Sequence, residues 1–214
     1  VGFVLFKNRP ANWKLTMNLQ LLNHIRFYSL FSCLVLTGLG QPNKALSQDL
    51  FQIDNSHSSV IFSISHFNIG YIYGRFNRCT GQAKIDRESP EQCQFNFEIE
   101  SKSIDTNDVG RDTHLKGVEF FDVDTFPKIE FASTKVEKVK SVYQVTGKLK
   151  LHGKEKEIKI PFQLLGVGKG PFGNTRMGMI AKFSIKRSEF GMDSMLEDVG
   201  DTVAITFSFE GIRQ

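Results

Sequence analysis

The sequence predicts an all-β domain of about eight antiparallel strands, rolled into a barrel or folded over into a sandwich, with one short helix. Three observations support this prediction. After residue 50 the hydrophobic pattern has a period of two, turn-forming residues separate the alternating runs, and a single interval has a helical pattern. Because no long helix is available to cover a sheet, the sheet must bury its apolar face by closing or by folding over.

The strands are predicted from alternation, which places every second side chain on one face, apolar inside and polar outside. The run Phe95–Glu100 alternates without exception. The eight expected strands, in chain order, are Val60–Phe67, Gly81–Asp86, Phe95–Glu100, Ile129–Val136, Val145–Leu151, Ile158–Leu164, Met177–Ile185 and Val203–Glu210.

Short connections join these strands. Residues 151–154 predict a tight hairpin, and Pro161, which has no N–H to donate, indicates an edge position or a bulge within its strand. The glycine-rich residues 166–170 are not followed by a helical pattern. We therefore expect a flexible connection there and not a phosphate-binding loop.

One interval, residues 105–121, has a helical pattern instead. Asp105–Thr106 can cap a short helix that runs through Lys116 and is ended by Gly117. A helix of this length between two strands can cover the mouth of a barrel.

The inward face of the expected sheet is rich in phenylalanine, of which the chain has 20. Phe and Met side chains form a soft apolar wall that suits an acyl or isoprenoid chain. An eight-stranded barrel is about the smallest that can either fill with side chains or hold one small ligand, so the pattern leaves both states open. The expected inner face comprises Phe62, Ile64, Phe95, Phe97, Leu149, Ile160, Phe162, Met177, Met179, Phe183, Ile205, Phe207 and Phe209.

The charge is concentrated near the N-terminus. The whole chain has 27 basic and 23 acidic residues, but residues 1–47 hold five of the basic residues and no acidic one. Residues 48–214 therefore have 22 basic against 23 acidic residues. A protein that follows a phosphate backbone needs a positive surface, so the composition argues against a nucleic-acid partner.

Residues 1–47 have the pattern of a targeting segment. The uncharged stretch around Leu30–Leu36 follows a basic flank and is shorter than the roughly 20 apolar residues of a spanning helix. With small residues at 45–47, it predicts a secretory signal cleaved after Ser47, and an uncleaved anchor is the alternative. The residues before Met17 are interpreted as an upstream extension. Residues 48–214 are expected to be a single exported domain.

The cysteines of the expected domain are Cys79 and Cys93. Export favours a disulfide. However, residues 87–92 have the pattern of a hairpin turn, which places Cys93 opposite Asp86 and too far from Cys79 to bridge. We therefore favour two free thiols.

Histidines and acids provide weak candidates for chemistry. His66 lies on the same face as Phe62 and Ile64, where it could bond a ligand or be an ordinary buried polar group. Asp112 and His114 could act as an acid/base pair, but two residues apart on a helix they point away from each other. No nucleophile motif accompanies them and no close pair of His or Cys predicts a metal site. No catalytic residue, metal or cofactor is expected.

Several segments together resemble the YceI family of exported lipid-binding proteins. They follow the family order over nearly all of residues 51–212. The segments are Ile53–Phe62 with His66 and residues 74–76, Ser103–Thr106, Arg111–Lys116 with Phe120–Asp122, Phe126–Phe131, Gly147–Leu149 with Leu151–Gly153, Arg187–Met192 and Gly200–Val203.

The resemblance implies a lipocalin-like antiparallel barrel whose short helix covers an opening and whose interior holds an isoprenoid, quinone-like or other long-chain amphiphile. It also agrees with export to the periplasm. Arg111 and His114 would then shape the mouth or contact a polar head group. The residues expected to contact the chain are Phe62, Ile64, His66, Phe95, Phe97, Leu149, Phe162, Met177, Met179, Phe183, Ile205 and Phe207.

The leading hypothesis is a non-catalytic carrier or sequestering protein for such a lipid, with a link to stress responses and transient contact with a membrane or lipid donor. One alternative is a periplasmic enzyme that acts on the lipid through His66 or the Asp112/His114 pair. Another is a structural protein with a filled barrel. A homodimer formed through an edge or a mouth is compatible with each of them.

Overall fold

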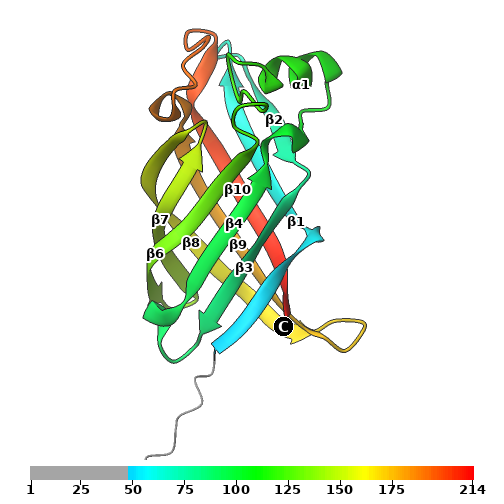
Figure 1. The fold of residues 1–214 in the computed structure, drawn as a ribbon, viewed down its shortest axis with the longest axis vertical. Helices are drawn as coiled ribbons and strands as arrows, with labels where there is room; N and C mark the ends of the chain where they lie inside the picture. The colour runs from blue at the N-terminus through cyan, green and yellow to red at the C-terminus, as the bar shows by residue number, and fades with distance from the viewer. Residues whose placement is uncertain (1–47) are drawn as a thin grey trace, which may run out of the picture. The chain divides into compact units, whose positions relative to one another are not determined.

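A computed structural model describes residues 48–214, which form a closed antiparallel β-barrel with eight strand positions and one short α-helix (Figure 1). The predicted eight-stranded barrel with a short helix is confirmed. The predicted signal segment, residues 1–47, lies outside the described residues. Within residues 48–214, no helix is both long and apolar enough to cross a membrane.

The described chain alternates long strands with short turns, and buried and exposed positions alternate along most strands. The elements are β1 (Gln48–His66), β2 (Gly70–Phe76), β3 (Cys79–Asp86), η1 (Pro90–Gln92), β4 (Gln94–Glu100), η2 (Ser101–Ser103), β5 (Ile104–Asp105), α1 (Val109–Lys116), β6 (Lys128–Val139), β7 (Val142–Leu151), β8 (Lys154–Lys169), β9 (Thr175–Lys186), η3 (Arg187–Phe190) and β10 (Val199–Arg213).

Ten strands occupy eight positions because two of the positions are interrupted. β1 pairs with β3 along its first residues and with β2 along its last ones, so β2 and β3 follow one another along the same edge of β1. β4 and β5 follow one another in the same way, beside β3 and β2. The barrel closes where β10 pairs with β1, for example at Phe207 and Val60.

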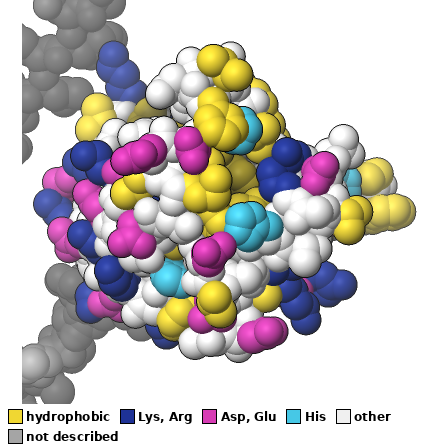
Figure 2. Space-filling view, turned by 90° about the horizontal axis from the view of Figure 1, so that it is seen from above, with side chains coloured by type: hydrophobic (Ala, Val, Ile, Leu, Met, Phe, Trp, Pro, Cys, Tyr) yellow, Lys and Arg dark blue, Asp and Glu magenta, His cyan; other side chains and the backbone are white. Residues whose placement is uncertain are grey.

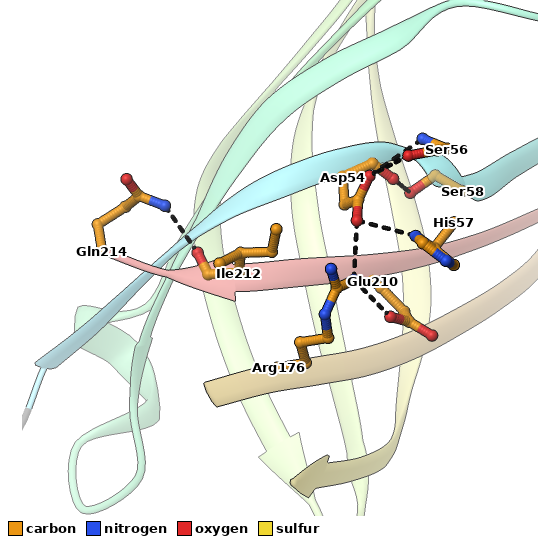
Figure 3. Close-up of polar contacts among 8 residues, drawn as sticks. All are labelled: Asp54, Ser56, His57, Ser58, Arg176, Glu210, Ile212 and Gln214. Atoms are coloured by element: carbon orange, nitrogen blue, oxygen red, sulfur yellow. Dashed lines mark hydrogen bonds and ion pairs between the residues drawn. The ribbon is translucent and has the colours of Figure 1, made fainter. Parts of the chain in front are cut away.

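Strand β1 bends at a polar cluster on the barrel wall centred on Asp54 (Figure 3). The β1–β10 register shifts just after Asp54. The Asp54 carboxylate accepts hydrogen bonds from the Ser56 hydroxyl (2.6 Å) and Arg176 (2.8 Å), and it lies 2.9 Å from His57 Nδ1. Arg176 also bonds Glu210. The Ser56 hydroxyl and then Arg176 lower the pKa of Asp54 well below its ordinary value, so Asp54 holds the bend as a carboxylate at neutral pH.

The helix α1 lies at one end of the barrel and ends where the sequence predicts, at Gly117. Its N-terminal cap is Asp108, whose side chain accepts from the Arg111 N–H, and not the predicted Asp105–Thr106 pair. Thr106 instead donates its N–H and hydroxyl to Asp112, at 2.8 and 2.6 Å. These bonds tie the first turn of the helix to the end of β5.

Seven of the eight predicted strands lie within observed strands, and the first, Val60–Phe67, extends one residue beyond the end of β1 at His66. β1 begins at Gln48, well before the predicted start, because its polar bulge hides the alternation. The glycine-rich residues 166–169 are the end of β8 and not a flexible connection. Pro161 lies where β8 pairs with β7 alone, since the β8–β9 pairing begins at Phe162. Of the two alternatives that Pro161 indicated, an edge position or a bulge, the pairing agrees with a locally unpaired edge.

Both Cys79 and Cys93 are buried free thiols, and the Cys93 sulfur lies 3.2 Å from the Asp86 nitrogen, as the hairpin argument predicts.

Opposite α1, the barrel interior is filled by large side chains. The largest side chains of this filled half, each less than 2% exposed, are Phe51, Phe95, Tyr143, Phe162, Met177, Met179 and Phe209.

Candidate functional site

The half of the barrel nearest α1 contains an apolar cavity of about 440 Å³. From above, at the end that carries α1, hydrophobic side chains surround a hollow (Figure 2). Side chains of the upper strand ends form its walls, and the α1 segment contributes Arg111, His114 and Leu115 at the opening. This volume lies in the range of pockets that hold drug-sized or lipid-like molecules.

Most of the residues that the sequence predicts to contact a ligand lie on this cavity. Each faces inward from a strand, and several are partly exposed because the space beside them is open. The predicted residues on the cavity wall are Phe62, Ile64, His66, Phe97, Leu149, Phe183, Ile205 and Phe207, together with Arg111 and His114 at the mouth.

Four predicted contact residues do not lie on the cavity: Phe95, Phe162, Met177 and Met179. They face inward, as predicted, but they pack in the filled half, where each is at most 1% exposed. Alternation identifies the inward face of a strand, but it does not say at which level along the barrel the interior is open. Their assignment to the ligand site is therefore corrected.

Other residues on the cavity wall were not predicted from the sequence. Ile99 and Phe131 lie on alternating strand faces and could have been found from the same pattern. Phe120 and Phe121 come from the loop after α1, and Met195 comes from the loop before β10, where no periodicity marks them. Only the tertiary structure brings these loops over the opening.

Arg111 lies at the mouth with its guanidinium held in place by Thr106. Nε donates to the Thr106 hydroxyl at 2.8 Å and one Nη donates to its carbonyl at 2.7 Å. No carboxylate in residues 48–214 forms an ion pair with Arg111. The remaining N–H groups of this oriented cation are therefore available to an acceptor at the cavity mouth.

Arg187 is a second cation on the cavity wall, and it is 4% exposed. It donates to the carbonyls of Met192, Ser194, Val199 and Gly200 at 2.6 to 2.9 Å. Burial lowers the pKa of Arg187, opposed by nearby acidic groups. The side chain acts as a clamp that shapes the loop between η3 and β10 around the cavity.

Asp112 and His114, considered above as a candidate acid/base pair, do not contact each other, as their helical spacing predicts. Asp112 bonds Thr106, whereas His114 Nε2 lies 2.9 Å from Glu119, so the two side chains serve different contacts. His66 lies on the cavity wall with its ring against Phe67. Across the described residues, no three or more His, Cys, Asp or Glu side chains gather as a metal-ligand set.

The polar groups on the cavity wall include no carboxylate. They are two guanidinium groups, two imidazoles and a hydroxyl, all of which can donate hydrogen bonds. These residues are His66, Thr106, Arg111, His114 and Arg187. Apart from these groups the lining is apolar, so the site can enclose a hydrocarbon chain and offer donors to an acceptor near its opening. A closed antiparallel barrel with such an interior belongs to the lipocalin-like class, whose members can hold one small ligand.

The chain belongs to the YceI-like family. The family profile, described as the YceI-like domain, matches residues 51–211. The UPF0312 protein ECA1782 of Pectobacterium atrosepticum is 33% identical over 187 residues, which cover 87% of this chain and 97% of that protein. The resemblance to the YceI family is thereby confirmed.

Solved structures share the fold. The crystal structure of Burkholderia cenocepacia BcnA matches with a TM-score of 0.67 and 25% identity, over 74% of this chain and 98% of that one. A polyisoprenoid-binding domain from Saccharophagus degradans, implicated in plant cell wall breakdown, matches with a TM-score of 0.61 and 14% identity, over 79% and 99%. At that identity the second likeness concerns the fold alone.

Proposed function

We propose that this protein binds an isoprenoid or another long-chain amphiphile in the upper half of its barrel and carries or sequesters it. The single observation that supports this most is the apolar cavity of about 440 Å³, lined by side chains from the strand ends and opening beside α1. Membership of the YceI-like family, and a fold neighbour described as polyisoprenoid-binding, point in the same direction.

The apolar lining is sufficient to bind a chain without any chemistry. Each methylene moved from water into such a wall contributes about 0.8 kcal/mol, so ten of them contribute about 8 kcal/mol before the entropic cost of association. Binding, and not turnover, is thus the function that the site supports best.

The polar end of the ligand is proposed to lie at the mouth beside Arg111 and His114. The Arg111 guanidinium is oriented by Thr106 and lacks a carboxylate partner within residues 48–214. A carbonyl, carboxylate or phosphate oxygen would accept hydrogen bonds from its free N–H groups, whereas a protonated amine would be repelled. A head group with acceptor oxygens is therefore preferred.

Loading is proposed to occur by transient contact with a membrane or another lipid donor. Met195 lies on the cavity wall and is 43% exposed, and Leu196 beside it is 41% exposed. Phe67, next to the cavity residue His66, is 49% exposed. Exposed apolar side chains beside an opening suit contact with an apolar donor.

Export is proposed from the pattern of residues 1–47, with the periplasm as the destination. Fractionation of producing cells, followed by N-terminal sequencing of the processed protein, tests this directly. A new N-terminus just after Ser47 in the periplasmic fraction is expected, and an intact N-terminus in the cytoplasmic fraction would contradict it.

Native mass spectrometry and organic extraction of the purified protein test ligand binding. A co-purified long-chain species is expected. Palmitate and geranylgeraniol, added at a hundredfold excess over their dissociation constants, should each raise the melting temperature by about 5–10 °C. Absence of any bound lipid, together with an unchanged melting temperature, would argue for a structural role of a barrel that holds no ligand.

A further inference from the structure

An aromatic layer divides the barrel interior into an open half and a filled half. We propose, resting on the function proposed above, that this layer is the floor of the binding site and that Phe97 at its centre sets the maximum length of the bound chain. The floor is defined by Phe97, Phe131 and Phe207, three rings on the cavity wall of which Phe97 contacts the other two.

On several strands, the boundary between the cavity and the filled half falls between two consecutive inward-facing residues. On β4, Phe97 lies on the cavity, and Phe95, two residues further from the opening, does not. On β10 the same change occurs between Phe207 and Phe209. Because side chains two residues apart share a strand face, each of these changes marks the depth at which the interior closes on that strand.

The boundary recurs on β8 and β9, two of the four strands that lie between β4 and β10 on one side of the barrel. On β8 it falls between Ile160, on the cavity, and Phe162, which is fully buried. On β9 it falls between Phe183, on the cavity, and Ala181, which is 1% exposed. Phe162 pairs with Ala181, so the boundary falls at the same register on these two strands. Ala181 in turn pairs with Phe207, which lies on the cavity, so the boundary steps by one residue pair between β9 and β10.

Phe97 is the ring that joins the two halves. Its centroid lies 4.9 Å from that of Phe207 in an edge-to-face contact and 6.3 Å from that of Phe131 in a stacked contact. Below the floor it lies 5.6 Å from Phe162 and 5.4 Å from Phe209. These contacts lie within the range of favourable aromatic pairs, so the layer resists displacement by a flexible chain.

A glycine makes room for the central ring. Gly81 on β3 pairs with Phe97. A Cβ at Gly81 would clash first with the Asn96 carbonyl oxygen, and it would also lie 2.9 Å from the Phe97 Cα and 3.0 Å from its Cδ1. The missing side chain lets the β4 backbone approach β3 closely and leaves space beside the Phe97 ring.

The filled half has no space into which the hydrocarbon chain of the ligand could extend. Phe95, Phe162, Met179 and Phe209 are each at most 1% exposed, and the rings of Phe95 and Phe162 stack 5.3 Å apart. Interiors packed in this way contain few voids larger than a water molecule. A chain longer than the open half must leave carbons at the mouth or displace rings.

The floor therefore predicts a break in the dependence of affinity on chain length. Below the break, each added methylene should tighten binding about fourfold, since each one buries further apolar surface. Beyond it, further methylenes should add little or should weaken binding. Phe97→Ala removes six ring carbons and should move the break to chains about four to six carbons longer.

The test measures the displacement of N-phenyl-1-naphthylamine from the purified protein by saturated fatty acids from octanoate to docosanoate. Three variants accompany the wild type. Phe97→Ala opens the floor, and Phe97→Leu opens it less, by about two or three carbons, and retains more packing. Met177→Ala is the matched control, because Met177 is 1% exposed and lies off the cavity in the filled half.

The expected result is a break that moves to longer acids in Phe97→Ala, moves less in Phe97→Leu and stays in place in Met177→Ala. A break at the same length in the wild type and in both Phe97 variants would overturn the role of the floor, with ligand binding itself left intact. Failure of the wild type to bind any acid of the series would overturn the proposed function and the role of the floor together.

Discussion

Replacing Ile205 with phenylalanine should stabilise the ligand-free protein and weaken ligand binding. Ile205 lies on β10, paired with Phe62 of β1 and Phe183 of β9, and all three side chains line the cavity. The substitution adds three heavy atoms to the wall of an open space. At about 0.8 kcal/mol per buried carbon, the added contact stabilises the protein by about 2 kcal/mol, or about 4–8 °C in melting temperature.

The same substitution should reduce affinity, because the new ring takes the space of about three chain carbons. Losing their burial corresponds to about 2.4 kcal/mol, or about fiftyfold weaker binding. Urea unfolding of the ligand-free protein gives the first quantity, and displacement of N-phenyl-1-naphthylamine by palmitate gives the second.

Met179→Phe is the matched control, since it also adds three heavy atoms but does so in the filled half, where Met179 is fully buried. Overpacking there should destabilise the protein by about 1–3 kcal/mol. The two variants are thus expected to change the free energy of unfolding in opposite directions. If Ile205→Phe destabilises the protein as much as Met179→Phe does, the space beside Ile205 is occupied and the reasoning from an open cavity fails.

Three further predictions follow from individual side chains. Tyr143 is fully buried and its hydroxyl has no hydrogen-bond partner among the described residues, so Tyr143→Phe should leave the urea midpoint unchanged or raise stability by about 1 kcal/mol, and a clear loss would reveal a partner. The pKa of Asp54 is lower in the folded protein than in the unfolded chain, where it has the ordinary carboxyl value near 4. The stability that the Asp54 carboxylate contributes to the fold is therefore complete above about pH 4 and is lost as the pH falls from there towards the folded pKa. Asp54→Asn should therefore be less stable at neutral pH and lose less on acidification, and urea midpoints measured against pH that run parallel to the wild type would contradict this. Arg111→Gln should weaken palmitate about tenfold and leave hexadecanol nearly unchanged, as measured by probe displacement, and equal losses for both would place the head group elsewhere.

Much of the fold follows from short-range pattern. Phe95, Phe97 and Ile99 alternate with polar residues, and this alternation alone places all three on the inside of the sheet. The helix before Gly117 and the position of Cys93 opposite Asp86 also follow from neighbours in the chain. By contrast, the start of β1 was missed, since the hydrogen-bonded cluster around Asp54 occupies a bulge that breaks the alternation.

The candidate site was predicted only in part, because it depends on the barrel's third dimension. Phe97 and Phe162 have the same pattern in the sequence, yet Phe97 lies on the cavity wall and Phe162 packs below the floor. Their difference comes from the level at which β4 and β8 meet across the barrel. Phe120 and Met195, which reach the cavity from loops, had no periodic signal at all.

The sequence by itself determined an all-β chain with one short helix, the inward face of each strand and the family, since these depend on neighbouring residues and on motifs read along the chain. The tertiary structure decided how the barrel interior is divided between open space and packed rings. That division depends on the volumes of side chains from eight strand positions summed at each level, and strand register sets which side chains share a level. Gly81 and Phe97 are far from each other in the sequence pattern, and only the pairing of β3 with β4 places them side by side in the proposed floor.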